Sequence, residues 1–463
     1  MKMLKIFCGL LFAFVTGLVC CAELKDGQLI GEPELLTYGN FLNEVEKNNN
    51  ELKSLQLKID AEEGKIAEEE RVYSYRLSVG GKGNLQSGKS KVLATYDTSI
   101  SKMVPTGTQI SLGLGTVEGK CVSIENAVPF MKIDQSLLRD IGGRCTKANI
   151  AKAKTRTKSV VYLLKYDKQK ILLNAKLAYW NLSYAKTVVE FRKMSLERAK
   201  KILKWNKKRF DMDLTEKADL LQSQSAVKLK ELSLKLAYED ESRARMAFNQ
   251  FLNIEDGKIK YDVERFKDKK NNSNGHNTLN KKNTRMDVLA ALEKVQESYY
   301  DKVSSKNRMG QDLIFNAGFA VNGLFYGEHF SFRSNRDKLS LSIGLRYTLP
   351  LDFQLRKIIN QGYNAAEIAS QRSADFAVLK EKNEWLQLTN DWTNAKMRFD
   401  LALEIENVQQ QRHEEGKSLL RRGRSTTHLV LQIEQDLDDA TLSVLQSIFE
   451  LIKIREQVET FYN

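Results

Sequence analysis

Two segments in the second half of the chain alternate between apolar residues and small or polar residues. In the first, apolar side chains recur at every second position, namely Leu313, Phe315, Ala317, Phe319 and Val321. In the second, Leu339, Leu341, Ile343, Leu345 and Tyr347 alternate with Ser340, Ser342, Gly344 and Arg346. A period of two places the two sets on opposite faces of a β-strand. The pattern predicts strands at about 312–325 and 338–349.

Strands of this length and pattern are typical of membrane β-barrels, in which about ten residues cross the bilayer with their apolar side chains towards lipid. A soluble sandwich with one wet face shows the same period, so the pattern alone leaves both classes open. On the membrane interpretation Ser340, Ser342 and Gly344 face a water-filled lumen. The candidate lipid-facing residues are Leu313, Phe315, Phe319, Leu339, Leu341, Ile343 and Leu345.

The first half of the chain carries a looser version of the same pattern, which predicts strands within about 74–138. Alternating runs cover 75–85, 110–115 and 130–138. Pro105-Thr106-Gly107 is a turn signal between two such runs. Segment 87–117 therefore predicts an extra hairpin beyond the two strands expected in each half, and the sequence does not specify where it packs.

Each strand region is followed by a long helical pattern. Leu182, Val189, Leu196, Leu203 and Phe210 recur every seven residues, with alanines on the neighbouring line at Ala178, Ala185 and Ala199. This is the heptad seam of a coiled-coil core. The pattern predicts a helix at about 146–212, roughly 100 Å long at 1.5 Å per residue, and a shorter one at 215–252. A second pair is predicted at about 354–422 and 425–461.

The two halves resemble each other at an offset of 210 residues, as in Leu221-Gln222 and Leu431-Gln432. We interpret 23–254 and 285–463 as two copies of one unit: a helix, strands, a long helix and a shorter helix. The polar segment 255–284 connects them. The two breaks between long and short helix fall at 211–215 and 421–425. Gly423 suits a helix end, and Thr215 or Ser425 suits the cap of the next helix.

The beginning of the chain has the pattern of a secretory leader. Met1–Lys5 is positively charged, 6–19 is apolar, and small residues end at Ala22. We predict a signal peptide at 1–22, cleaved after Ala22; the alternative is lipid attachment at Cys21. Export to an oxidising compartment permits a disulfide between Cys121 and Cys145. Because a spanning strand at 130–138 holds them apart, that pairing stays open.

Composition narrows the class of protein further. The 463 residues include only 4 prolines, which favours very long helices, and no apolar run after the leader reaches the 18 residues of a membrane helix. The net charge is +14, and it is spread along helices with acidic neighbours. This favours a solvated helical surface over a nucleic-acid site.

The sequence gives little support for a catalytic or cofactor-binding site. The segment 83–90 matches a Walker A pattern, but a strand pattern follows where a phosphate-binding loop needs a helix. A polar loop between strands is the preferred interpretation. His276, His329, His413 and His428 are scattered without metal or dyad spacing. We therefore predict no enzyme activity, no metal and no cofactor.

The two helix breaks carry charge. The second is strongly basic, with Arg421, Arg422 and Arg424 around Gly423 and Ser425, and the first holds Asp211, Asp213 and Thr215. Solvated charge at a helix hairpin is one interpretation. The other is a cationic ring at a pore constriction, formed when symmetry repeats the arginines around an axis.

Over residues 34–463 the chain resembles the outer-membrane efflux proteins, the TolC-like family. The resemblance rests on the order and spacing of short segments: 36–52, 134–143, 347–351 and 422–432. The sequence departs from the family at Ser136, where proline is usual, and at Asp213, where glycine is usual.

The resemblance implies a mainly helical homotrimer in the outer membrane. Each chain would supply four strands to a shared twelve-stranded β-barrel and its helices to a periplasmic α-barrel. Such a channel works without catalysis, together with a periplasmic adaptor protein and an inner-membrane efflux pump or secretion ATPase. Two other classes remain: an exported periplasmic coiled-coil scaffold, and a cytosolic nucleotide- or nucleic-acid-binding protein.

Overall fold

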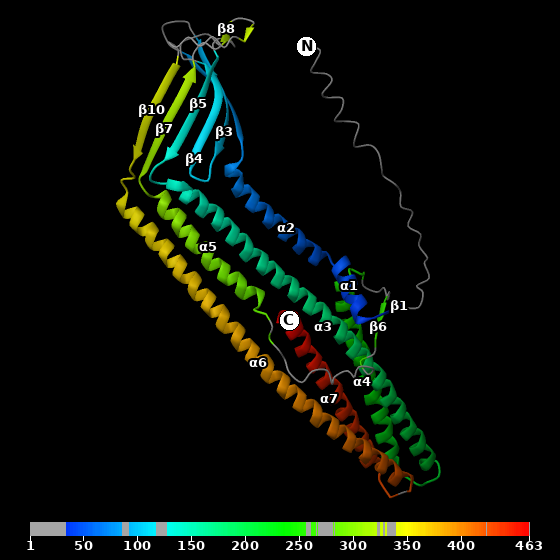
Figure 1. Ribbon diagram of the computed structural model, residues 1–463. Helices are drawn as coiled ribbons and strands as arrows, with labels where there is room; N and C mark the ends of the chain where they lie inside the picture. Colours follow the sequence, from blue (N-terminus) through cyan, green and yellow to red (C-terminus); the bar gives the residue numbers. More distant parts are fainter. Residues whose placement is uncertain are drawn as a thin grey trace, which may run out of the picture.

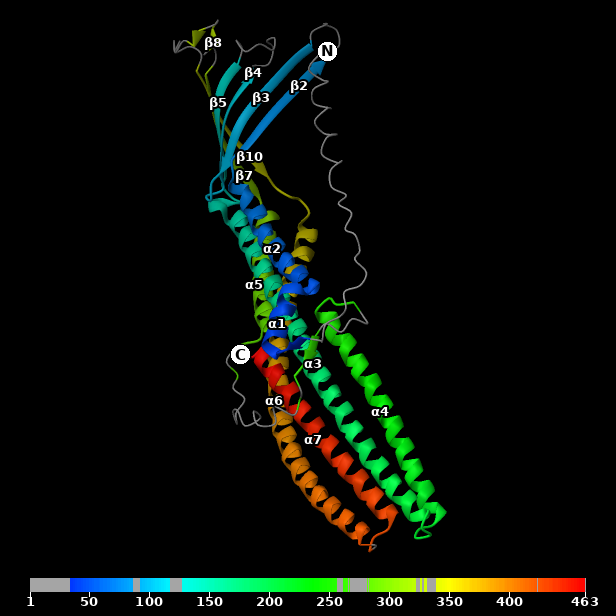
Figure 2. The ribbon, with the colours of Figure 1, turned by 90° about the vertical axis from the view of Figure 1, so that its right-hand side faces the viewer.

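Long helices set the shape of the molecule, which is elongated, with strands at one end and helix hairpins at the other (Figures 1 and 2). The computed structural model describes residues 34–85, 92–116, 127–255, 261–264, 266, 281, 283–321, 325–326, 329–330, 339–422 and 424–462. The helices of this part are α1 Tyr38–Asn48, α2 Asn50–Glu70, α3 Arg144–Phe210, α4 Lys217–Phe251, α5 Met286–Arg308, α6 Phe353–Arg421 and α7 Thr427–Phe461.

Helix α3 forms around the heptad seam that the sequence shows. It has 67 residues, so it is about 100 Å long, and α6 with 69 residues matches it. Leu182, Val189 and Leu196 on the seam are buried, and so are the alanines beside them. Leu196 and Ala199 pack with Val227 of α4, which closes the first helix hairpin. Small residues beside large ones let the helices approach closely.

The shorter helices keep the spacing of the sequence pattern. Helix α4 covers 217–251 and α7 covers 427–461, so both ends differ by 210 residues (427 − 217 and 461 − 251). The strands do not follow this symmetry, because the first half contributes four long strands to the main sheet and the second half contributes two. The twofold repeat of the whole unit therefore stays a proposal.

One antiparallel sheet of six strands stands at the end of the helices (Figure 1). Its spatial order is β10-β7-β5-β4-β3-β2. The strands are β2 Arg76–Leu85, β3 Val92–Met103, β4 Thr108–Thr116, β5 Ala127–Ser136, β7 Asp312–Val321 and β10 Leu339–Thr348. Two small pairs lie outside this sheet: β1 Glu34–Leu36 with β6 Tyr261–Val263, and β8 Phe325–Tyr326 with β9 His329–Phe330.

The expectation of four strands per chain is therefore wrong for this sheet. The extra hairpin, β3 with β4, lies inside the sheet between β2 and β5 and pairs with both. Its turn at 104–107 packs against the start of α3. A Cβ added at Gly143 would lie 2.1 Å from the carbonyl oxygen of Pro105, and one at Gly107 would lie 2.6 Å from that of Asp140. Both glycines have positive φ, so both their size and their conformation are needed here.

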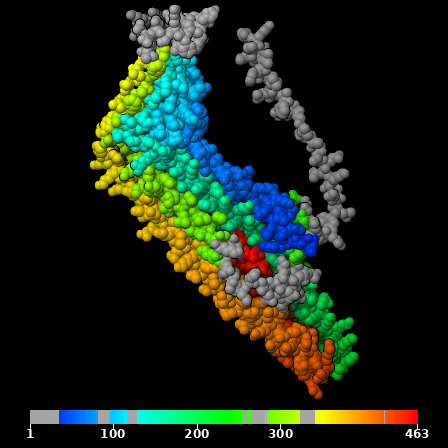
Figure 3. Space-filling view, in the orientation of Figure 1, coloured from blue at the N-terminus to red at the C-terminus, as the bar shows by residue number. Residues whose placement is uncertain are grey.

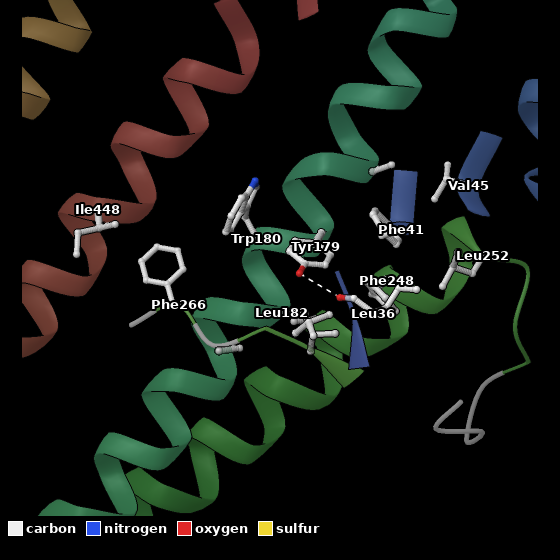
Figure 4. Packing of buried hydrophobic residues seen from close by; sticks show 14 of the residues in the cluster. Leu36, Phe41, Val45, Tyr179, Trp180, Leu182, Phe248, Leu252, Phe266 and Ile448 are labelled. Atoms are coloured by element: carbon white, nitrogen blue, oxygen red, sulfur yellow. Dashed lines mark hydrogen bonds between the residues drawn. The ribbon is translucent and has the colours of Figure 1, made fainter. Parts of the chain in front are cut away.

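The main hydrophobic core lies at the middle of the molecule, where α1, α3, α4 and α7 meet (Figure 4). Tyr179 of α3 is fully buried, and its hydroxyl donates to the carbonyl oxygen of Leu36 at 3.2 Å. Phe41 of α1 stacks on Phe248 of α4 with ring centroids 4.8 Å apart. Trp180 packs against Phe266, which fixes the segment after β6 on the helices. In Figure 3 the N-terminal helices, in blue, lie on the surface near the red end of α7.

Some expectations fall outside the described residues. The leader at 1–22, its cleavage point and Cys21 lie there, as do Cys121, most of the connection 255–284 and residues 86–90 of the Walker-like segment. Within the described part, Gly83 pairs with Ala94 in the β2–β3 hairpin, and the chain continues as strand β3 instead of a helix. A search of the described helices finds none with the length and hydropathy to cross a membrane.

Candidate channel surfaces: the two-faced sheet and the helix tips

The main sheet has one apolar face. Paired residues of antiparallel strands project to the same side, so the register defines rows across the sheet. One row crosses all six strands and is apolar throughout, with exposed fractions from 37% for Met131 to 69% for Leu341. Its members are Leu341, Phe319, Met131, Leu112, Ile100 and Leu77. A soluble sandwich covers such a row with a second layer, but here the sheet stands clear of the described helices (Figure 2).

The opposite face is small and polar. The neighbouring row consists of Ser342, Gly318, Lys132, Ser111, Ser101 and Arg76. On this face Lys132 forms an ion pair with Asp134 at 2.9 Å, and the amide of Asn316 donates to the same carboxylate. Charged groups on one face and bare aliphatic groups on the other suit a wall between water and lipid.

The structure places the predicted strand residues on one face. Leu313, Phe315 and Phe319 of β7 pair with Tyr347, Leu345 and Leu341 of β10 and share the apolar face with Ile343. The backbone of Leu339 pairs with Val321, while its side chain lies outside the described part. Sequence reasoning did not place Ile100 and Leu112 in this face, although the alternation at 110–115 was a signal for Leu112.

Both edges of the sheet are open. Within the described residues β2 and β10 each pair on one side only, over ten residues. The outer side of each strand presents backbone N–H and C=O groups that need partners.

The helix hairpins end in two similar turns at the far end from the sheet (Figure 1). The amide of Leu214 donates to the Arg209 carbonyl at 2.8 Å, and the amide of Arg424 donates to the Leu419 carbonyl at 2.9 Å. Asp213 adopts φ 58°, the left-handed conformation that glycine takes readily and aspartate tolerates. Asp213 thus adopts the backbone conformation of the turn at the position where the resemblance leads one to expect glycine. Gly423 lies outside the described residues.

The charged residues of the turns are exposed. Asp211, Asp213, Arg421, Arg422 and Arg424 all point to solvent in the single chain, while Thr215 and Ser425 are half-buried. Between these arginines and the acidic residues of the first turn, no ion pair is found among the described residues.

The predicted helix caps are displaced by one residue. Helix α7 is capped by Thr426, whose hydroxyl accepts from the Leu429 amide at 3.3 Å, and Ser425 is not the cap. Helix α4 begins after Glu216 without a side-chain cap, and Thr215 donates instead to Asp219 at 2.7 Å. Both turns use one residue more than the sequence pattern indicates before the helix begins.

Buried polar contacts tie the two hairpins together just above the turns. The Thr427 hydroxyl donates to the side-chain oxygen of Asn206 at 3.1 Å, and the Asn206 amide donates to Ser223. All three side chains are buried. On the surface beside them, Gln222 of α4 lies 2.5 Å from His428 of α7. The two tips therefore form one unit within a chain.

A buried ionic cluster lies further along the same helices, and sequence reasoning missed it. Asp438 of α7 is fully buried and contacts Arg198 at 2.5 Å and Lys230 at 2.6 Å. Glu434, one turn earlier, contacts Arg198 at 2.9 Å and His413 at 2.7 Å. These residues come from α3, α4, α6 and α7, so the cluster joins all four helices.

Electrostatics at this cluster favour the ionised form of Glu434. Burial alone raises the pKa of Glu434, but the hydrogen bonds and charges of His413 and Arg198 outweigh it and hold the pKa below its usual range. Burial lowers the pKa of Lys417, which faces Glu434 from α6. The imidazole of His413 therefore already has a partner, the carboxylate of Glu434. No group of metal-ligating side chains is found in the part of the chain that the structure describes.

No protein-family model and no curated protein matches the chain. Solved structures do. The outer-membrane channel OprN superposes with a TM-score of 0.66 at 13% identity, over 91% of this chain and 89% of that chain. The fold is that of an outer-membrane channel. CusC, described with its transmembrane channel formation, gives 0.67 at 11% identity over 94% and 95%. MtrE of Neisseria gonorrhoeae, in its open state, gives 0.65 at 11% over 91% and 88%.

These matches confirm, for the fold, the resemblance seen in the sequence. The neighbours are channel proteins and not enzymes.

Proposed function

We propose that the chain is one protomer of a homotrimeric outer-membrane channel, an exit duct for efflux or secretion. The observation that carries the proposal is the six-strand row of exposed apolar side chains opposite a polar row, at one end of helices about 100 Å long. A bilayer covers the first face, and a water-filled lumen hydrates the second.

Transport through this duct needs no bond to be made or broken. The cargo enters at the helix tips, follows the lumen of the helical part, and leaves through the strand end. Because sheet edges do not persist in lipid, β2 and β10 must be paired by other copies of the chain. Helices of this length can cross the periplasm, which supports a position of the exposed tips at its inner side.

The resemblance supports two partners: a periplasmic adaptor protein that docks at the tips, and an inner-membrane efflux pump or secretion ATPase. The exposed turns at 211–215 and 421–425, at the far end from the sheet, suit such docking. A leader at 1–22 accounts for export. Mass spectrometry of the mature protein distinguishes the two predicted ways of processing this leader. Cleavage after Ala22 gives an N-terminus at Glu23, and the alternative gives a lipid-modified Cys21.

Cell fractionation tests the proposal against the alternatives. We expect the mature protein in the outer-membrane fraction, resistant to extraction by salt or alkali. Recovery from the soluble periplasm would favour the coiled-coil scaffold, which explains the heptads but not the exposed apolar row. Recovery from the cytosol would contradict both.

A further inference from the structure

Resting on the proposed function, we infer that the β2 edge of one copy pairs with the β10 edge of the next, and that three copies close an eighteen-stranded barrel. The wall is then about 1.5 times as wide as the twelve-stranded barrel implied by the resemblance, since barrel diameter grows roughly linearly with strand number. The partner of each open edge is a second copy of this chain.

The number of strands in one chain supports this barrel. Six strands share one continuous ladder of pairing within the chain, and the β3–β4 hairpin occupies its middle. Six are too few for closure by one chain, because bacterial barrels of this kind begin at about eight strands. Three copies provide eighteen (3 × 6), an even number that preserves the up-and-down order.

The β3–β4 hairpin is a fixed part of the sheet. Its turn packs on Gly143 at the start of α3. The side chain of Thr108, just after the turn, donates to Gln135 of β5. Asp140, beside this turn, accepts from the Cys145 amide at 2.6 Å and so holds the first turn of the helix. Removing the hairpin from the wall would break the junction between sheet and helix.

The two edges of the sheet are complementary. Strand β2 leaves α2 and runs away from the helices, whereas β10 runs towards α6, so the two edges meet antiparallel in neighbouring copies (Figure 1). Each has ten residues. Leu77 and Val79 on β2 continue the apolar face of Leu341 and Ile343 on β10. Both strands carry serines on the other face, at Ser78 and Ser342.

Disulfide trapping in outer-membrane preparations tests this pairing, in a background with Cys121→Ser and Cys145→Ser. Single cysteines at Ser340, Ser342 or Gly344 of β10 are combined with Arg76→Cys or Ser78→Cys of β2. We expect at least one pair to shift most of the protein to covalent dimers and trimers on a denaturing gel.

Two controls make the result specific. Replacing Ser78→Cys by Ser99→Cys moves the thiol one strand inwards, about 4.8 Å further away, beyond the reach of a disulfide. That pair should give no covalent oligomer. Because Ser78 and Ser99 are paired within a chain, the double variant Ser78→Cys, Ser99→Cys should form an internal bridge instead.

The outcomes separate this inference from the proposed function. An internal bridge between Ser78→Cys and Lys132→Cys would join β2 directly to β5 and leave a four-stranded wall, which overturns the inference while the channel stands. An outer-membrane trimer without any β10–β2 link would also overturn the inference and leave the proposed channel standing. A soluble monomer would contradict the proposed function itself. Native mass spectrometry of the detergent-solubilised particle counts the copies.

Discussion

At the residue scale, the sequence predicted side chains that follow a local period. The heptad leucines of α3 and the alternating residues of β10 lie where their spacing indicates, because the period of a helix or strand is a local property. The ionic cluster around Asp438 could not be predicted in this way. Arg198 and Asp438 are 240 residues apart, and only the folded helices bring them together.

Removing Arg198 should destabilise the helix bundle strongly. Arg198→Ala leaves the buried Asp438 and Glu434 with fewer cations, which we expect to cost about 3 kcal/mol, the low end for a broken buried pair because Lys230 remains. Arg412→Ala on α6 is the matched control, since its ion pair with Asp436 is exposed and worth about 0–1 kcal/mol. Thermal unfolding followed by circular dichroism should separate the two variants; equal losses would show that the cluster contributes no more than a surface pair.

The pH dependence of stability should reveal Glu434. A carboxylate whose pKa is depressed in the folded protein stabilises it above its unfolded pKa, about 4.3, and that stabilisation is lost as the pH falls through the folded pKa. Glu434→Gln should therefore lower the melting temperature at pH 7. The difference from the native protein should shrink as the pH is lowered below about 4. A difference that grows on acidification would contradict this assignment.

At the element scale, helix bounds were predicted to within about two residues. Charged turns and capping residues mark helix ends locally, so α3 and α6 lie within two residues of their expected ranges. Strands were harder, since short runs at 75–85 and 110–115 carry little signal by themselves. Nothing in the sequence showed that β3 and β4 lie between β2 and β5, because pairing order is set by contacts between distant segments.

The cap of α7 provides a test at single-residue precision. Thr426→Ala removes the hydroxyl that accepts from the Leu429 amide, and we expect a loss of about 1 kcal/mol. Ser425→Ala, its neighbour, should have little effect, because Ser425 does not cap the helix. Melting temperatures measured side by side decide; a larger loss from Ser425→Ala would return the cap to the residue that the sequence pattern favoured.

The two faces of β10 should respond differently to charge. Ile343→Arg places a cation on the apolar face and should cost about 2–4 kcal/mol near the bilayer midplane. Gly344→Arg is the control, since nothing lies within 4 Å of a Cβ added there and the face is polar. We expect the first variant to be depleted from the outer membrane and the second to assemble. Equal depletion would contradict the assignment of the faces.

At the scale of the whole molecule, the fold was predicted and the number of strands in the main sheet of one chain was not. Leader, alternating strands and long helices together indicated an outer-membrane channel, and the likeness to OprN and CusC confirms that fold. The predicted twelve strands rested on the family resemblance. This chain has six strands in its main sheet, and the threefold assembly inferred above would therefore contain eighteen.

The basic turns should determine behaviour at the periplasmic entrance. In the proposed homotrimer, Arg421, Arg422 and Arg424 of each copy would lie close to one axis, where they would favour anions. Replacing all three by glutamate should shift the reversal potential in planar bilayers towards cation selectivity. Higher open conductance without that shift would mean that they act as a latch with acidic residues of neighbouring tips. An unchanged channel would leave them as solvated or adaptor-facing residues.

The central claim is that the main sheet separates lipid from a water-filled lumen. Single cysteines placed along β10 test it in outer-membrane vesicles, in a background without Cys121 and Cys145, with a membrane-impermeant thiol reagent. We expect alternation: strong labelling at Ser340, Ser342 and Gly344, and weak labelling at Leu341, Ile343 and Leu345. Equal labelling along the strand would contradict it.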